Sequence, residues 1–395
     1  MPQHGEILHV TGRHYRTRRP VELSVEDGRI ADVRALEKPA ESNALPWIAP
    51  GFIDIQSNGY GGQEFSSPEL TVEKVVEIAA QQAAFGVTQF CPTVTTAGLD
   101  TLVHSVRTIA EACQRHPQVA RTAPAIHLEG PFIASEDGPR GAHPLEHCRP
   151  PDWEEFERIQ QAADGRIRIL TMSPEFANAP EFIRRAVGSG VVVAIGHTAA
   201  DSGQIRAAVD AGASLSTHLG NGAHRALRRH PNYLWDQLGD DRLRASLIVD
   251  GHHLPPEVVQ TMVRAKTPER CILISDLSGL AGLPPGRYDT QLCALEILPD
   301  GRLVIAGQDQ LLAGASRPIG YGVVGAMRFA GVDLATAVHM ASHHPARLLG
   351  MPTVDLLPGD AADAVLFDLP LGADGAPTAL VVRATLQGGE LVKVA

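Results

Sequence analysis

The sequence predicts an α/β fold, a TIM-type (β/α)8 barrel with a small β-sandwich domain built from both chain ends. Two observations lead to this prediction. In the middle of the chain, short β-rich runs alternate with helical patterns, and eight of these runs end in polar residues. Both chain ends consist of short strand-like segments separated by turns. A doubly wound open sheet would have fewer repeats and usually an early Gly-rich phosphate loop, which this sequence lacks.

The two chain ends are expected to form one β domain. The N-terminal segment "PVELSVEDGRIADVRAL" contains "EDGRI", which is a hairpin signal. The C-terminal segments "GDAADAVLFDLP" and "TALVVRATLQGGELVKV" have the same strand-rich character. We therefore assign residues 1–47 and 352–395 to the small β domain and residues 48–351 to the barrel.

The central segment carries the barrel pattern. In "TVEKVVEIAAQQAAFG", residues 71–86, the apolar residues fall on one helical face and Gly86 ends the helix. Eight β-then-α units over about 300 residues fit a (β/α)8 barrel. The eight polar strand endings lie at residues 54–58, 88–93, 125–130, 169–175, 191–198, 215–221, 246–253 and 271–276.

Composition narrows the class of protein. The chain has 395 residues, of which 44% are hydrophobic and 20% charged, as in an ordinary globular enzyme. Its net charge of -11 disfavours nonspecific nucleic-acid binding. No stretch of about 18 apolar residues occurs, so we expect no membrane span. The five widely spaced cysteines include no C-x-x-C pair, which favours a reducing cytoplasm over a disulfide framework.

Polar residues at the strand endings suggest a catalytic site. The candidates are Glu129, His197, His218, His252, His253 and Asp276. One carboxylate and two imidazoles form a three-ligand set with an open position, which is the usual form of a catalytic zinc site. Water bound there has its pKa lowered toward neutrality, and Asp276 could take its proton. Each residue alone also has a structural interpretation, such as a helix cap, but their coincidence at one barrel face favours a site.

The stretch "GFIDIQSNG", residues 51–59, raises a question about the metal. Gln56 and Asn58 lie on the same side of an extended chain. Many metal hydrolases have a His-x-His pair at this place, and neutral amides are poor zinc ligands. The stretch is compatible with a lost metal, with a site that needs fewer ligands, or with an unrelated protein.

Several motifs in order resemble the N-acetylglucosamine-6-phosphate deacetylase family of the amidohydrolase superfamily. They are "PGFIDIQSNGYGG", "HLEGPF", "RGAHP", "IGHT", "THLGN", "VDGHH", "LISD", "LAGA" and "LPGDAADAVLFD". The resemblance implies that Glu129, His197 and His218 hold one divalent metal ion per chain and that Asp276 is the acid/base. Gln56 and Asn58 would then support the ligands or line the pocket. Zinc suits the ligand set, with iron, manganese and cobalt as alternatives.

The resemblance also implies a set of substrate contacts. These are Ala142, His143, Asn221, Gly222, Arg229, His253, Leu312, Ala313 and Gly314. The sequence departs from the family pattern in two places: Asn221-Gly222 replaces an Asn-Ala pair, and "HPN" replaces a Glu-Pro-Gly after Arg229. The basic cluster formed by Arg225, Arg228, Arg229 and His230 is either a phosphate grip or a solvated loop.

Three functions remain open on the sequence alone. The leading hypothesis is a metal-dependent hydrolase that removes the N-acetyl group from an amino sugar. The favoured substrate is N-acetylglucosamine 6-phosphate, and the products are then glucosamine 6-phosphate and acetate. A second keeps the chemistry on an unphosphorylated acetamido sugar or another N-acyl compound. A third is a non-catalytic binding or scaffold protein on an amidohydrolase barrel. The resemblance suggests a homodimer that acts on a small-molecule amino sugar. The cysteine pattern favours a cytoplasmic location, and the net charge and the lack of a long apolar stretch lead us to expect no nucleic-acid or membrane partner.

Overall fold

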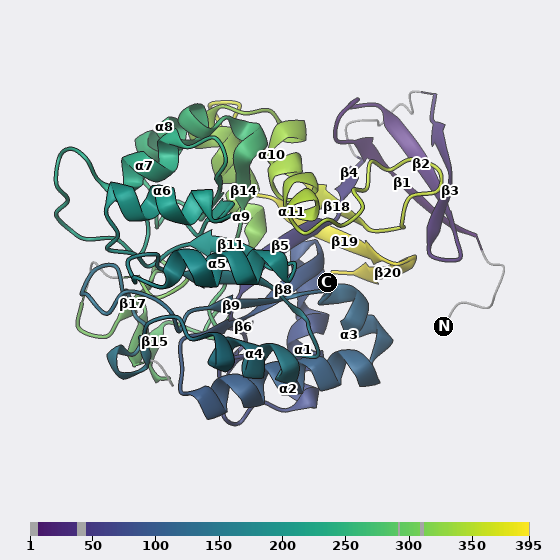
Figure 1. Cartoon of the computed structure of the whole chain (residues 1–395). Helices are drawn as coiled ribbons and strands as arrows, with labels where there is room; N and C mark the ends of the chain where they lie inside the picture. Colours follow the sequence, from purple (N-terminus) through teal and green to yellow (C-terminus); the bar gives the residue numbers. More distant parts are fainter. Residues whose placement is uncertain (1–6, 38–44, 291–292, 309–311, 395) are drawn as a thin grey trace.

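The computed structural model describes residues 7–37, 45–290, 293–308 and 312–394. Residues 1–6, 38–44 and 395 of the expected β domain lie outside the described part. Figure 1 shows a large body of helices around a central sheet, with a smaller all-β part beside it that contains both ends of the chain.

Eight parallel strands form the predicted barrel. They pair in the order β14-β13-β12-β11-β10-β9-β8-β5. The two edges of this sheet meet where Ser57 bridges Leu277 and the Asp276 N–H donates to the Gln56 carbonyl at 3.0 Å. The strands are β5 (Phe52–Ser57), β8 (Val87–Thr95), β9 (Ile126–Glu129), β10 (Ile167–Met172), β11 (Val192–Ile195), β12 (Leu215–Ser216), β13 (Arg244–Leu247) and β14 (Cys271–Leu273). The predicted barrel is therefore confirmed.

Helices cover the outside of this sheet (Figure 1). They are α1 (Val72–Gln81), α2 (Leu99–Arg115), α3 (Pro117–Thr122), α4 (Trp153–Ala162), α5 (Ala179–Gly188), α6 (Ser202–Asp210), α7 (Tyr233–Gly239), α8 (Pro256–Lys266), α9 (Ile319–Gly325), α10 (Leu334–Met340) and α11 (His343–Leu348). The short 3-10 segments η2 (Gln82–Phe85), η3 (Leu145–His147) and η4 (Pro268–Arg270) and the π-helical turn η5 (Ala326–Ala330) supplement them.

The helix expected over residues 71–86 forms largely as predicted. The Thr71 hydroxyl accepts a hydrogen bond from the Lys74 N–H, which caps α1. After the 3-10 turn η2, Gly86 adopts φ 76°, a left-handed conformation that glycine favours, and the chain enters β8. None of the helices among the described residues is long and apolar enough to cross a membrane.

Both ends of the chain contribute to one seven-stranded sheet. Its order is β20-β19-β18-β4-β1-β2-β3. The Asp27-Gly28 turn joins β2 to β3, with both residues at positive φ, as the hairpin signal predicts. The strands are β1 (Leu8–His14), β2 (Pro20–Glu26), β3 (Arg29–Ala35), β4 (Trp47–Pro50), β18 (Ala364–Asp368), β19 (Val381–Gln387) and β20 (Glu390–Lys393). The expected domain boundary between residues 47 and 48 falls within β4.

Two small antiparallel sheets decorate the barrel and were not predicted. One is the hairpin of β6 (Gly59–Tyr60) and β7 (Gln63–Glu64). The other follows β14 and consists of β15 (Gly286–Asp289), β16 (Ala294–Ile297) and β17 (Leu303–Ile305). Both sheets contribute residues to the cavity described next.

Candidate active site

A cavity of about 470 Å³ lies at the carboxyl ends of the barrel strands, where active sites of such barrels are found. Its volume suits a sugar-sized ligand. Glu129, His197, His218, Asp276 and Asn58 line it. The substrate residues expected from the resemblance that also line it are Ala142, His143, Asn221, Gly222, His253, Leu312, Ala313 and Gly314.

Three side chains converge at the floor of this cavity. Glu129 ends β9, and His197 and His218 follow β11 and β12. The Glu129 Oε1 atom lies 3.2 Å from His197 Nε2 and 3.0 Å from His218 Nε2, and the two nitrogens are 3.1 Å apart. All three side chains are almost fully buried. The sequence-predicted ligands are thus in mutual contact.

The proton arrangement at this triangle fits a bound cation. The His197 Nδ1 atom lies 2.8 Å from the Pro139 carbonyl oxygen. A carbonyl only accepts hydrogen bonds, so Nδ1 carries a proton, and a ring with that single proton presents the Nε2 lone pair to the Glu129 carboxylate. Two acceptors at this distance repel unless a cation lies between them. Ligand atoms on a tetrahedral zinc ion are about 3.3 Å apart, so the triangle fits such an ion.

The charges within the triangle depend on one another. Burial would raise the pKa of Glu129, but its contacts with His197 and His218 hold this pKa well below its usual range. Burial would lower the pKa of His218, but the Glu129 carboxylate raises it. The carboxylate therefore stays ionised and can serve as an anionic ligand.

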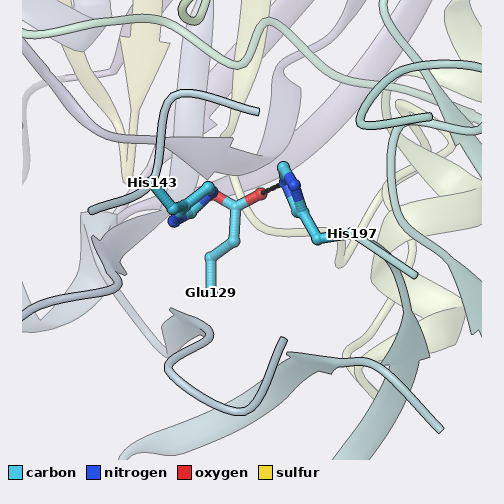
Figure 2. A group of neighbouring side chains, drawn as sticks. All are labelled: Glu129, His143 and His197. Atoms are coloured by element: carbon cyan, nitrogen blue, oxygen red, sulfur yellow. Dashed lines mark hydrogen bonds and ion pairs between the residues drawn. The ribbon is translucent and has the colours of Figure 1, made fainter. Parts of the chain in front are cut away.

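His143 is a fourth buried neighbour. Figure 2 shows Glu129 between His143 and His197, with both rings directed at its carboxylate. Ligand atoms of these three residues lie within 4.8 Å of one another, and the His143 and His197 rings are 4.3 Å apart. Within the described part of the chain, the buried His143 Nδ1 atom has no hydrogen-bond partner. Burial lowers the pKa of His143 to about 3, so the ring is neutral.

Asp276 lies beside this group and receives two amide donors. Its Oδ1 atom accepts hydrogen bonds from Asn58 Nδ2 at 2.8 Å and from Gln56 Nε2 at 3.1 Å. The Gln56 amide also donates to Glu129 Oε1 at 3.0 Å. Burial, with a further contribution from the Glu129 charge, raises the pKa of Asp276 to about 6. A carboxyl group with this pKa can exchange a proton near neutral pH.

Three of these residues have an unusual backbone conformation. His197, His218 and Asp276 adopt φ values of 50°, 28° and 51°. This left-handed region is costly for residues with a Cβ atom, and such conformations gather at functional sites. The observation supports a shared role for the three residues and does not depend on their side-chain contacts.

The structure explains one departure from the family pattern. Gly222 has a φ of 55°, and a Cβ atom there would lie 2.8 Å from His197 Nδ1. With this backbone path, only glycine fits without moving the histidine.

The basic cluster lies only partly at the cavity. Arg225 lines it, whereas Arg228, Arg229 and His230 are exposed and are not among the lining residues. The structure therefore does not bring Arg229 together with the other predicted substrate residues within its own chain. His253, by contrast, is held at the cavity by Asp250, whose Oδ2 atom lies 2.9 Å from His253 Nδ1.

Sequence reasoning missed three residues near the site. His127 is buried under Glu129, with its ring nitrogens 2.9 Å from the Ile55 carbonyl and 2.7 Å from the Thr171 hydroxyl. Glu64 and Arg302 line the cavity from the two unpredicted sheets. Burial raises the pKa of Glu64 to about 7. The "HLEGPF" motif already included His127, but no spacing pointed to Glu64 or Arg302.

A protein-family model, the Amidohydrolase family, matches residues 47–392. This chain belongs to the amidohydrolase family. It is 34% identical over 386 residues to the N-acetylglucosamine-6-phosphate deacetylase of Bos taurus, which covers 94% of this chain and 88% of that protein. It is 33% identical over 349 residues to the N-acetylgalactosamine-6-phosphate deacetylase of Escherichia coli O157:H7, which covers 88% of this chain and 90% of that protein.

Solved structures of amidohydrolases agree with the fold. A mutant N-acetyl-D-glucosamine-6-phosphate deacetylase from Mycobacterium smegmatis, in complex with N-acetyl-D-glucosamine-6-phosphate, superposes with a TM-score of 0.84 at 30% identity. The match covers 98% of this chain and 99% of that chain. The enzyme from Thermotoga maritima, at 24% identity, has a TM-score of 0.81 over 98% of this chain and 99% of that one, which shows the shared fold.

Proposed function

We propose that this amidohydrolase removes the N-acetyl group from an N-acetylhexosamine 6-phosphate, releasing acetate and the amino-sugar phosphate. The observation that carries the proposal is the convergence of Glu129, His197 and His218 beside Asp276 in a cavity of sugar size. The relatives named above support the reaction, since both curated proteins are deacetylases of amino-sugar phosphates.

Members of the amidohydrolase superfamily depend on a metal ion. Glu129, His197 and His218 would hold one such ion, and the carboxylate with two imidazoles suits zinc. When bound, the metal supplies Lewis-acid chemistry, polarising the amide carbonyl and making water more acidic. We assign His143 to the pocket wall instead, because the three atoms of the proposed ligands already lie within 3.2 Å of each other.

The chain's own residues carry the proton transfers. Asp276 takes a proton from the attacking water and then gives it to the departing nitrogen, so that the amine leaves in a stable form. Its pKa of about 6 suits both steps. Asn58 and Gln56 keep its carboxylate aimed by donating to one oxygen, Oδ1, which leaves Oδ2 for the proton. His143, with a neutral ring, would orient the acetyl carbonyl or a sugar hydroxyl.

The remaining substrate contacts are proposals carried over from the family. Ala142, Asn221, Gly222, His253 and the loop 312–314 support them by lining the cavity. Arg229 is retained as a phosphate contact from the family pattern alone. The sugar is either the glucosamine or the galactosamine epimer, because relatives of both specificities have similar sequence identity to this chain.

The test is a deacetylation screen that measures acetate release. The substrates are N-acetylglucosamine 6-phosphate, N-acetylgalactosamine 6-phosphate and the two free sugars, each with the zinc-loaded enzyme. We expect hydrolysis of at least one phosphorylated sugar. Preference for the free sugars would favour the second hypothesis, and a protein that binds no stoichiometric metal and releases no acetate would favour a non-catalytic scaffold.

We also propose that the enzyme is a cytoplasmic homodimer. The compartment rests on the five cysteines, which are all free thiols in the structure, and the dimer rests on the family resemblance. Size-exclusion chromatography with light scattering gives the mass to compare with 42.1 kDa for one chain.

A further inference from the structure

The inserted sheet of β15, β16 and β17 places an arginine at the cavity wall. Arg302, at the entry to β17, lines the cavity together with Leu295 of β16. Packing holds the sheet in place, because its apolar side chains form a small core with the loop that contains Ala313. That core consists of Leu280, Leu295, Ile297, Leu303 and Ala313.

Among the described residues, Asp300 is the hydrogen-bond partner of the Arg302 side chain. The Asp300 carboxylate accepts hydrogen bonds from the Arg302 backbone N–H at 3.0 Å and from its Nε at 2.8 Å. The turn is closed by the Leu298 N–H, which donates to the Arg302 carbonyl at 2.8 Å. Among the described residues, neither terminal amino group of Arg302 makes a hydrogen bond. The guanidinium is thus fixed through Nε and keeps two amino groups for a ligand.

Arg302 contributes a positive charge to the wall of this cavity. The carboxyl groups that line it are Glu64, Glu129 and Asp276, and the described lining residues include two guanidinium groups, those of Arg225 and Arg302. The Arg302 side chain is 38% exposed, so water screens it only in part. Arg225 is exposed and forms no hydrogen bond or ion pair among the described residues, so nothing fixes its position.

His252 adds a neutral donor to the same wall. It lines the cavity, and its buried Nε2 atom has no hydrogen-bond partner among the residues that the structure describes. Burial, followed by the Arg317 charge, lowers the pKa of His252, while the charge of Asp300 acts in the opposite direction. His252 and Arg302 line the same cavity. A buried polar atom without a partner calls for an explanation, and an anionic ligand oxygen supplies one.

We propose that Arg302 binds the phosphate monoester of the substrate, with His252 as a second donor, and that the inserted sheet thereby sets the preference for phosphorylated over free acetamido sugars. A guanidinium with two free amino groups matches a pair of phosphate oxygens, which a lysine ammonium does not. The proposal rests on the deacetylase function above and identifies Arg302 as a residue that recognises the phosphate of the substrate.

The experiment compares Arg302→Met, Arg302→Lys and Arg287→Met with the wild type. Arg287 is the matched control, an exposed arginine on β15 of the same sheet that does not line the cavity. For Arg302→Met, kcat/KM on the 6-phosphate sugar should fall by about ten- to a hundredfold, mainly through KM. We expect its activity on the free sugar to be unchanged, which also shows that the variant is folded. Arg302→Lys should recover part of the loss, and inorganic phosphate should inhibit Arg302→Met more weakly than the wild type.

The outcomes separate this proposal from the proposed function. If the wild type deacetylates no acetamido sugar, the proposed function fails. If it deacetylates free and phosphorylated sugars equally, or if Arg302→Met keeps wild-type kcat/KM on the phosphorylated sugar, deacetylation stands and the role of Arg302 is refuted. Arg229→Met, measured in parallel, decides whether the exposed loop contributes as well. A loss in Arg229→Met without a loss in Arg302→Met also overturns the proposal.

Discussion

Replacing Asp276 with asparagine separates proton transfer from folding and metal binding. The two side chains have nearly the same shape, and the asparagine oxygen can still accept the hydrogen bonds that Asn58 and Gln56 donate at 2.8 and 3.1 Å. The substitution removes the proton acceptor and leaves Glu129, His197 and His218 untouched. A general acid/base contributes typically about a hundred- to ten-thousandfold to the rate, so kcat should fall by at least a hundredfold with the metal retained.

The structure also predicts the stability of this variant. A pKa raised from 3.8 to about 6 means that keeping Asp276 ionised at pH 7 costs the metal-free fold roughly 3 kcal/mol, at about 1.4 kcal/mol per pH unit. Because the carboxyl pKa is higher in the folded state, this cost is present above the folded pKa and disappears below the unfolded one. Asparagine removes the charge, so metal-free Asp276→Asn should unfold at the same temperature as the wild type or higher at pH 7.

Three measurements test these predictions for Asp276→Asn. Steady-state acetate release gives kcat, elemental analysis gives the metal content, and thermal unfolding of the metal-free protein gives stability. In the wild type, kcat/KM should fall as the pH drops toward and below about 6, because protonation removes the base. Near-normal turnover of Asp276→Asn would refute the assigned role, and joint loss of metal and stability would mean that Asp276 is a ligand or a structural group.

Two further predictions concern the proposed metal ligand His218 and the half-buried His339 of α10. His218→Ala should lose metal and activity together. The wild type should hold about one ion per chain, because Gln56 and Asn58 donate hydrogen bonds to carboxylates and so provide no second pair of ligands. Elemental analysis that finds two ions per chain would contradict this. Burial, reinforced by the His343 charge, lowers the pKa of His339 to about 4, so stability is complete above about pH 6.5 and declines as the pH falls toward 4. Since this ring is only half-buried, we expect a loss of about 1 kcal/mol, and thermal unfolding of His339→Gln should show a flatter pH dependence.

The barrel and its main site were predictable because they depend on local patterns. Apolar runs that end in polar residues identified all eight strands, and the carboxyl ends of parallel strands meet on one face. Glu129, His197, His218 and Asp276 had to lie near one another once the barrel was assumed. Their distances, and the left-handed backbone at three of them, were not predictable, because His and Asp adopt a positive φ more often than most residues but still only in a small minority of cases.

The inserted sheet escaped the sequence analysis for a physical reason. Its strands, β15 to β17, are short, and they follow Asp276 in a segment where the barrel pattern expects a loop. Their stability comes from contacts with Leu280 and Ala313, which no local periodicity records. Arg302, in the segment "PDGRL", therefore received no role from the sequence, whereas Arg229 received one from the family resemblance. Residues that reach a site from an insertion depend on tertiary packing, which the sequence does not display.

Gln56 and Asn58 resolve the question raised by the missing His-x-His pair. Carboxylates only accept hydrogen bonds, so contacts with Glu129 and Asp276 require both amides to present their NH2 groups. A histidine pair at these positions would offer lone pairs for a second cation, whereas these amides offer protons. Gln56 thus bridges the proposed metal ligand and the proposed acid/base, and partly neutralises the repulsion between two buried carboxylates. The amides donate protons where a second metal ion would place its charge, which supports the proposal of one ion per chain.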